Sequence, residues 1–314
     1  MARPIILGVV GDSAAGKTTI SKGLVAILGA EHVTHIGTDD YHRYDRGQRS
    51  ERGITPLHPD CNYVDIMAQH VRHLRDGEPI LKPVYRHGDG TFGPPMYVVP
   101  KRFVVIEGLL GYHTDQLSDA HDVRVFLAPP EELRRAWKIK RDTTKRGYSE
   151  EQVLEELDRR EPDSAAFIRP QRRNADMLVS FQPGDDSDKL DVELTLTQGL
   201  PHPDLSFLLP RDVSMGLALE HDRLGSRRLF VPGNLDPARG AAIEEAIWEK
   251  MQFAHRLRTE RLGEFNVGVE THRSESLAIV QVLILYHLVM AKAAVAVGGD
   301  TASARTGHAR PTDG

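Results

Sequence analysis

One nine-residue segment near the N-terminus constrains the fold of this chain more than any other: GDSAAGKTT, residues 11–19. It follows an apolar, β-branched run at residues 4–10, which predicts a buried strand. It matches the pattern G-x-x-x-x-G-K-[ST], in which glycines let successive backbone N–H groups curl around phosphate oxygens. A helix predicted from about residue 18 to residue 28 would direct its positive N-terminal end at the same anion. The segment therefore predicts a strand, a phosphate-binding loop and a helix, in that order.

The loop pattern also assigns roles to individual side chains. Lys17 would reach the β and γ phosphates of a nucleoside triphosphate, and Thr18 would offer its hydroxyl to Mg²⁺. The alternative is an ordinary glycine-rich turn, but four specified positions between a strand and a helix rarely coincide by chance. The expected ATP-binding residues are Gly11, Asp12, Ser13, Ala14, Ala15, Gly16, Lys17, Thr18 and Thr19.

Composition narrows the range of partners and compartments. The net charge of −5 argues against a general nucleic-acid-binding protein, because such proteins gather Lys and Arg over a broad face. With one cysteine, Cys61, the chain can form no internal disulfide, which suits a reducing compartment. The apolar start is too short for a secretory signal and already belongs to the strand before the phosphate loop. We therefore expect a cytoplasmic protein that acts on small molecules.

A strongly apolar segment lies near the C-terminus, at residues 277–297. Gln281, His287 and Lys292 interrupt it, and a charged residue near the middle of a membrane is unfavourable. We therefore expect no membrane span but a helix that is either buried within its own domain or faces a second subunit. The second alternative would make the protein a homodimer or a larger homo-oligomer.

The first half of the chain has the pattern of a parallel sheet. Short apolar runs alternate with longer helical patterns, as in βαβ units. The strand candidates are 4–10, 33–38, 103–106 and 123–127.

The pattern changes near residue 180. Several strand-like pieces separated by turn residues predict an antiparallel extension, and they lie at 177–183, 190–198, 205–209, 214–221 and 227–233. Helices at about 236–259 and 274–297 follow, each with a candidate N-terminal cap. We expect a phosphate-loop core at 1–180, an extension with closing helices packed on it at 181–297, and a disordered tail at 298–314.

A polar segment follows the second predicted strand: HIGTDDYHRYDR, residues 35–46. It would lie at the carboxyl edge of the sheet, where open α/β sheets bind their ligands. Asp39 could accept the proton of an attacking hydroxyl, while His42 and Arg46 could hold an anionic group of the substrate. The alternative is a polar turn in which Asp39 or Asp40 caps the next helix.

Two further segments carry charges suited to phosphate chemistry. RFVVIEG, residues 102–108, contains Glu107, which could hold Mg²⁺ directly or through water, or could be a surface residue at a strand end. A helical pattern at 131–149, which Gly147 would end, is strongly basic. Its cations suit either a lid over transferring phosphate or a solvated helix face, and they are Arg134, Arg135, Lys138, Lys140, Arg141, Lys145 and Arg146.

With these motifs in order, residues 4–180 resemble the phosphoribulokinase and uridine kinase family of P-loop kinases. The matching motifs are GDSAAGKTT, the stretch 39–67 that begins DDYHRYDR, KPVYRHGDGTFGPP, VVIEGLLGYH, AWKIKRDTTKRGYS and RREPDSAAFIRPQRRNAD. The resemblance implies a nucleoside-kinase-like parallel sheet flanked by helices. Within the family, the chain looks most like the plant and cyanobacterial type of phosphoribulokinase. That likeness implies ATP- and Mg²⁺-dependent phosphorylation of D-ribulose 5-phosphate to D-ribulose 1,5-bisphosphate.

The resemblance also implies roles for residues that match the family's motifs. Asp39 would be the base that takes the proton from the sugar hydroxyl, and Tyr85 and His87 of PVYRH would line the acceptor pocket. A mobile basic lid, which includes Asp142, would cover the phosphates. The implied catalytic residues are Asp39, Lys17, Arg141 and Arg146, the implied substrate-binding residues are His42, Arg46, Tyr85, His87, Lys138 and Arg141, and the implied metal ligands are Thr18 and Glu107.

Two other functions stay open. Uridine kinases share the loop, the early Asp, the Tyr of PVY and the lid, so the acceptor could be uridine, cytidine or another pentose derivative. DYHRYDR, with its His and Arg, fits a charged sugar phosphate better than a nucleoside. A regulatory module that binds ATP without transferring phosphate is the third reading.

The chain departs from the plant-type pattern in one respect. Enzymes of the plant type are regulated by a disulfide between a cysteine of the phosphate loop and another cysteine just before the catalytic Asp. This chain has Ala15 and Gly37 near those places, so thiol regulation of that kind cannot operate.

Overall fold

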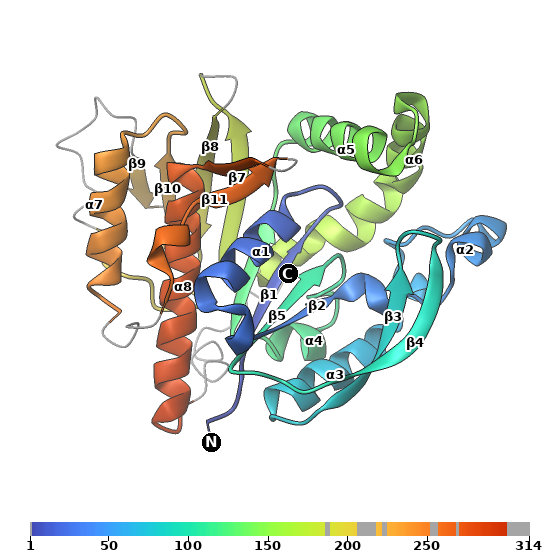
Figure 1. Ribbon diagram of the computed structural model, residues 1–314, viewed down its shortest axis with the longest axis horizontal. Coiled ribbons are helices and arrows are strands. Elements are labelled where there is room, and N and C mark those ends of the chain that lie inside the picture. The colour runs from blue at the N-terminus through green and yellow to red at the C-terminus, as the bar shows by residue number, and fades with distance from the viewer. Residues whose placement is uncertain are drawn as a thin grey trace, which may run out of the picture.

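A computed structural model describes residues 2–185, 189–205, 218–221, 225–251, 257–267 and 270–299. Its centre is an eight-stranded sheet with helices on both faces (Figure 1). In spatial order its strands are β2 (Val33–Gly37), β5 (Phe103–Gly108), β1 (Ile5–Gly11), β6 (Val123–Leu127), β7 (Met177–Pro183), β8 (Leu190–Leu196), β10 (Arg227–Val231) and β9 (Ala218–His221). Strands pair in parallel from β2 to β7 and antiparallel from β7 to β9. The α/β fold predicted from the sequence is confirmed.

The helices cover both faces because β1 is buried on both. Ile5 and Leu7 of β1 belong to the same core as α1 and the long C-terminal helix, whereas Ile6 packs on the opposite face with α3. The helices are α1 (Lys17–Leu28), α2 (Arg46–Arg52), α3 (Val64–Arg75), α4 (Asp115–Asp119), α5 (Glu131–Arg146), α6 (Glu150–Asp163), α7 (Pro237–Trp248) and α8 (Glu275–Ala296). This alternation is the period of two expected for a strand buried between two layers.

The boundary expected near residue 180 falls inside β7, and one sheet continues through it. Residues on both sides of the boundary share one hydrophobic core. We therefore propose that 181–297 is an extension packed on the 1–180 core, as the sequence pattern predicts, rather than a separately folded unit.

Helix α8 is buried within its own chain. Ser274 caps it by accepting a hydrogen bond from the backbone N–H of Leu277 at 3.2 Å. It packs against α7, β8 and β1. In the described part of the chain it is the one helix long and apolar enough to cross a membrane, and 67% of its most apolar 18-residue window is buried. Of the two alternatives left open by the sequence, burial within the domain accounts for its composition.

Helix α7 is shorter than predicted. Asp236 caps it and Pro237 begins it, as expected, but it ends at Trp248 rather than near residue 259. Lys250 and Met251 instead donate backbone hydrogen bonds three residues back, which tightens the chain into a turn. The predicted strand at 205–209, except Leu205, the first part of 214–221 and the tail from residue 300 lie outside the described residues.

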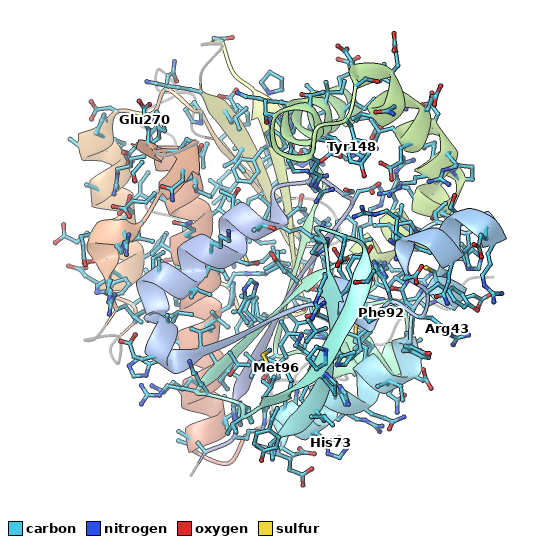
Figure 2. All side chains as sticks on the ribbon, turned by 45° about the vertical axis from the view of Figure 1, so that its right-hand side comes forward. Arg43, His73, Phe92, Met96, Tyr148 and Glu270 are labelled. Carbon is cyan, nitrogen blue, oxygen red and sulfur yellow. The ribbon has the colours of Figure 1, made fainter. Side chains whose placement is uncertain are left out.

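Two hairpins stand outside the main sheet: β3 (Ile80–Arg86) with β4 (Thr91–Val98), and β11 (Glu264–Val267) with β12 (Glu270–Arg273). The inner side of the first hairpin carries Lys82 and Tyr85, both buried. Its outer side exposes apolar groups, among them Phe92 and Met96, which Figure 2 shows on β4. The first hairpin is therefore anchored mainly through β3, with Val98 at the end of β4 buried in the same core.

A close contact between α1 and α8 gives a test of this packing. A Cβ on Gly23 of α1 would lie 2.2 Å from Nε2 of Gln281, a fully buried side chain whose Oε1 accepts a hydrogen bond from Gly263 N at 2.7 Å. Helix propensity alone makes a Gly-to-Ala change in a helix stabilising by about 0.5–1 kcal/mol. We expect Gly23→Ala to destabilise the fold instead, by roughly 1–3 kcal/mol, because it displaces Gln281.

Urea unfolding would measure the effect, with Gly88→Ala as the control, since that exposed turn glycine has open space around its Cβ position. A stabilised Gly23→Ala protein would contradict the packing.

Candidate active site

The phosphate-binding loop joins β1 to α1 in a tight curve. Gly16 takes a left-handed conformation with φ of 93°, and Ala14 does so with φ of 65°, which is unfavourable for a residue with a Cβ. The ammonium of Lys17 lies inside the curve and donates hydrogen bonds to the carbonyl oxygens of Gly11 at 2.9 Å and Asp12 at 2.7 Å. Burial lowers the pKa of Lys17, and the carboxylate of Asp39 opposes that shift. The loop therefore holds a cation inside its curve, directly before the first turn of α1.

Asp12 braces the loop instead of facing it. Its carboxylate accepts hydrogen bonds from the backbone N–H of Ser13 at 2.7 Å and from the hydroxyl of Ser164, just after α6. The guanidinium of Arg134 on α5 lies 3.7 Å from Asp12 and also donates to the carbonyl oxygen of Ser13 at 3.1 Å. The loop is thereby tied to α5, the predicted lid, and to the segment that follows α6.

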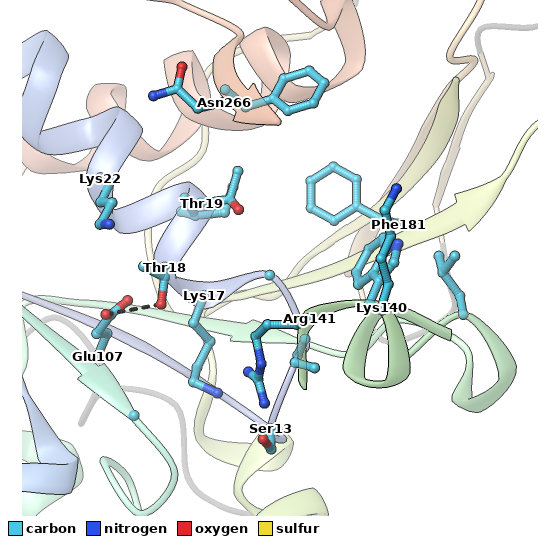
Figure 3. Close-up of a pocket in the computed structure, with 18 of the residues that line it drawn as sticks. Ser13, Lys17, Thr18, Thr19, Lys22, Glu107, Lys140, Arg141, Phe181 and Asn266 are labelled. Atoms are coloured by element: carbon cyan, nitrogen blue, oxygen red, sulfur yellow. Dashed lines mark hydrogen bonds between the residues drawn. The ribbon is translucent and has the colours of Figure 1, made fainter. Parts of the chain in front are cut away.

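Glu107 stands at the end of β5, beside the first turn of α1. The hydroxyl of Thr18 donates to Oε1 of Glu107 at 3.3 Å (Figure 3), while Oε2 is buried without a hydrogen-bond partner among the described residues. Burial raises the pKa of Glu107, whereas contact with His35 lowers it. The net result is a pKa below the usual value of a glutamate. A charged carboxylate and a hydroxyl at the phosphate loop are the oxygen ligands that Mg²⁺ prefers, so these residues fit the ion.

The two adjacent aspartates after β2 differ sharply. Asp40 accepts hydrogen bonds from the buried ammonium of Lys82 and from the backbone N–H of Tyr85 at 2.8 Å. The side chain of Asp39 is 40% exposed and faces the cleft, with His87 Nε2 at 3.6 Å. Burial alone would raise the pKa of Asp39, but the neighbouring His42 and His87 hold it below its usual value. Asp40 anchors the β3–β4 hairpin, and Asp39 is the carboxylate available to a substrate.

Neither aspartate caps the next helix. Asp45 caps α2 by accepting the backbone N–H of Gln48 at 2.8 Å, in a capping box that Gln48 completes. The capping alternative left open by the sequence therefore does not apply to Asp39 or Asp40.

His42 is buried, and its hydrogen bond with Asn62 determines which ring nitrogen carries the proton. The amide nitrogen of Asn62 donates to the carbonyl oxygens of Pro56 at 3.0 Å and His58 at 2.9 Å, so the amide oxygen must face His42 Nδ1 at 2.8 Å. Nδ1 therefore carries the proton, and Nε2 is an acceptor. Burial lowers the pKa of His42, which keeps the ring neutral. A neutral His42 accepts hydrogen bonds better than it attracts phosphate, and its contact with an anionic group of the substrate stays a prediction.

Arginines supply positive charge to this end of the cleft. Arg46 opens α2 and donates to the carbonyl oxygen of His87 at 2.7 Å. Arg49, one turn later, is buried and donates to the hydroxyl of Tyr85 at 2.6 Å. Both arginines, Tyr85 and His87 line the cleft. Sequence analysis missed Arg49, although its place three residues after Arg46 puts it on the same helix face.

Arg160 of α6 also escaped the sequence analysis. It lines the cleft and pairs with Glu156 one turn earlier, and burial lowers its pKa while the charge of Asp39 opposes that shift. Its motif, RREPDS, belongs to the family resemblance but indicates no role for this residue. A partly buried arginine cannot be recognised from the sequence because its neighbours along the chain are as polar as those of a surface arginine.

The basic helix predicted as a lid is α5, and Gly147 ends it in a left-handed conformation as expected. Arg141 and Arg146 line the cleft, and Figure 3 shows Arg141 pointing into the same space as Lys17. Lys138 does not line the cleft. Its ammonium is buried between α5 and α6, 2.8 Å from Asp142 and 3.6 Å from Glu156. The substrate contact expected of Lys138 is therefore absent from this arrangement of the described residues.

Asp142 organises the cations of α5. Its carboxylate accepts hydrogen bonds from Lys138 at 2.8 Å and Arg141 at 2.7 Å, and it lies 3.4 Å from Arg146. Burial opposes ionisation, but bonding to Arg141 and Lys138 lowers the pKa of Asp142 to about 2. The cluster is a built electrostatic network, which the solvated-face alternative does not explain.

One cleft of about 2250 Å³ begins at the phosphate loop, and Lys17, Thr18, Asp39, Arg46, Glu107 and Arg141 are among the residues that line it. The loop, the Thr18 and Glu107 pair, and a carboxylate with cations at the far end of the same cleft together define a P-loop protein of the kinase class. A family model described as "Phosphoribulokinase / Uridine kinase family" matches residues 6–187. The chain belongs to this family.

Some relatives of the chain are named phosphoribulokinases and others uridine kinases. A phosphoribulokinase from Synechocystis sp. is 39% identical, over 58% of this chain and 54% of its own length. The chloroplastic phosphoribulokinase of Triticum aestivum is 33% identical, over 63% and 55%. A uridine kinase from Streptococcus gordonii is 30% identical, over 62% and 94%. The match spans about half the length of the Synechocystis and Triticum phosphoribulokinases.

The solved structure of a phosphoribulokinase from Rhodobacter spheroides has a TM-score of 0.57 and 20% identity, and the match covers 79% of this chain and 97% of that one. At this identity the likeness shows the fold.

The hydrogen bonds of Asp40 predict that its mutation destabilises the fold. Asp40→Ala removes the partner of the buried Lys82 ammonium and of the Tyr85 N–H, and we expect it to lower the free energy of unfolding by about 1–3 kcal/mol. The control is Asp60→Ala, whose carboxylate is 82% exposed. Chemical denaturation measures both, and equal stabilities of the two variants would disprove the anchoring role of Asp40.

Proposed function

We propose that the chain transfers the γ-phosphoryl group of ATP to O1 of D-ribulose 5-phosphate and releases ADP and D-ribulose 1,5-bisphosphate. The observation that carries the proposal is the acceptor end of the cleft, where the carboxylate of Asp39, 3.6 Å from His87, lines the same space as Arg46 and Arg49. A carboxylate for a hydroxyl and cations for a phosphate suit a phosphorylated sugar. The phosphoribulokinase names of relatives 33–39% identical support the same substrate.

The chain's own residues account for each part of the reaction. Asp39 accepts the proton as O1 of the sugar attacks the γ-phosphorus, and the bond from that phosphorus to the bridging oxygen of ADP breaks. Lys17, Arg141 and Arg146 neutralise the charge that develops on the transferring group. Thr18 and Glu107 would hold Mg²⁺, which supplies further charge neutralisation when bound.

The sugar phosphate has two kinds of partner in this proposal. Arg46 and Arg49 bind its phosphate, and Arg160 adds positive charge nearby. His42, neutral with Nε2 as acceptor, takes a hydrogen bond from a sugar hydroxyl. Lys138 acts indirectly by positioning Asp142 and, through it, Arg141.

The second candidate is phosphorylation of uridine or cytidine. The observation in its favour is the Streptococcus gordonii uridine kinase, of which the match covers 94%. A neutral nucleoside would leave the cations of the acceptor pocket without a partner, and this places the sugar phosphate first. An ATP-binding regulatory module ranks third, because it would leave Asp39 and the α5 cations without a task.

Other properties of the protein are proposals as well. We propose ATP and Mg²⁺ as donor and metal, no nucleic-acid or membrane partner, and a cytoplasmic location, which the lone buried Cys61 supports. We also propose a homodimer or larger homo-oligomer. The exposed apolar side of the β3–β4 hairpin supports this proposal, with Met96 48% and Tyr97 67% exposed. Helix α8, on which the sequence-based expectation depended, is buried within its own chain.

ADP release from Mg·ATP by the purified protein tests the acceptor directly. We expect release with ribulose 5-phosphate and none above background with uridine. We further expect Arg46→Ala to raise KM for the sugar phosphate at least about tenfold while KM for ATP changes little, since an arginine-to-phosphate bond contributes about 1.5–3 kcal/mol.

Release with uridine alone would favour the nucleoside branch of the family. Release with neither acceptor would favour the regulatory module. Equal rises of both KM values in Arg46→Ala would remove Arg46 from the acceptor site.

The proposed base is tested by Asp39→Asn. Loss of a general base lowers kcat by on the order of 10² to 10⁴, and ADP binding should persist because the phosphate loop is untouched. Steady-state kinetics and calorimetric ADP titration measure the two effects, with Asp60→Asn as the exposed control. Turnover at the wild-type rate in Asp39→Asn would disprove the assignment.

A further inference from the structure

The hairpin β11–β12 lies over α1, although the family model ends far before it, at residue 187. The carbonyl oxygen of Glu264 lies 3.9 Å from the Cβ position of Gly23 on α1. Strand β11 contacts α1, and Figure 1 shows the two close together. The C-terminal extension therefore brings a wall to the phosphate-binding side of the core.

The hairpin is held firmly at its base. Gly263 donates its N–H to buried Gln281 of α8 at 2.7 Å and accepts the N–H of Ser274 at 3.0 Å. Arg273, at the end of β12, donates to the carbonyl oxygen of Leu262 at 2.7 Å and pairs with Glu244 of α7 at 2.8 Å. These bonds fix where β11 faces the cleft.

Three aromatic side chains from distant parts of the sequence line the same cleft: Trp137 of α5, Phe181 of β7 and Phe265 of β11. The Trp137 ring lies 3.9 Å from the Cβ position of Gly16, so this group begins directly beside the phosphate loop. Trp137 and Phe265 are only partly buried, and each packs against the core while lining the cleft. Figure 3 shows Phe181 and Asn266 bordering the space next to Thr19.

We infer that this aromatic end of the cleft is the base subsite of the nucleotide, and that Phe265 of the C-terminal hairpin is a base-stacking residue. The inference rests on the proposed function in that the bound ligand is a nucleoside triphosphate or diphosphate. The acceptor end carries the charged groups Asp39, Arg46 and Arg49, whereas planar apolar rings can meet the flat face of a base. With its phosphates on the loop, a nucleotide can extend its base only away from the acceptor.

The test measures binding rather than activity. Calorimetric titrations with ADP and with inorganic pyrophosphate separate the contribution of the base from that of the phosphates. We expect ADP to bind wild-type protein more tightly than pyrophosphate. Phe265→Ala and Phe265→Leu should weaken ADP binding about tenfold and leave pyrophosphate binding within about twofold of wild type. Phe265→Tyr, which keeps the ring, should retain ADP affinity.

The control variant is His272→Ala on β12. His272 touches Phe265, with 5.6 Å between ring centroids, but it does not line the cleft. It should leave ADP affinity within about twofold of wild type. A loss as large as that of Phe265→Ala would show that hairpin integrity, not the ring, matters, and would overturn the inference.

Three further outcomes overturn it. These are ADP affinity unchanged in both Phe265→Ala and Phe265→Leu, equal losses for ADP and pyrophosphate, and no preference of the wild type for ADP over pyrophosphate. The proposed reaction can fail separately: intact ADP binding with the predicted Phe265 effects, but no phosphoryl transfer to ribulose 5-phosphate, would refute the reaction and uphold the subsite.

Discussion

The parallel pairing of β2, β5 and β1 is the constraint on which the site depends. Val9 of β1 and Gly37 of β2 both pair with Glu107 of β5, so all three strands end at one edge of the sheet. The phosphate loop, the Glu107 carboxylate and the loop that carries Asp39 must therefore meet there. Gly108 permits the contact, because a Cβ at this position would lie 1.6 Å from the hydroxyl oxygen of Thr38, next to Asp39. The geometry of the reaction follows from the strand register.

The cleft divides by chemistry around this edge. At the acceptor end, arginines and the carboxylate of Asp39 line the space proposed for the sugar phosphate, while neutral His42 contributes an acceptor atom. At the other end, aromatic rings lie among charged side chains such as Lys140. Between them, the loop is tied through Asp12 to Arg134 of α5 and to Ser164. A displacement of α5 would therefore also move the phosphate loop.

The sequence predicted the core better than its surroundings, for physical reasons. Strands β1 and β6 read clearly because buried strands are uniformly apolar, and the loop between β1 and α1 has a strict residue pattern. The β3–β4 hairpin went unrecognised because one side is exposed and two prolines interrupt β4. The sequence identified the cationic residues, but where their side chains lie depends on partners far away in the sequence. Lys138 turns inward to Asp142 and Glu156, and Phe265 reaches the cleft through packing on α8 that no local pattern encodes.

The order of strands has one more consequence, for the solubility of the chain. Exposed sheet edges are templates for pairing with other molecules, and long flat ones promote aggregation. The two outer strands of the main sheet, β2 with five residues and β9 with four, are short. The seven-residue β7, which would be the edge of a sheet made of parallel strands alone, is fully paired with β8. The antiparallel strands thus protect the enzyme's core from self-association through its backbone, a task that constrains their pairing but leaves their outward side chains free to vary.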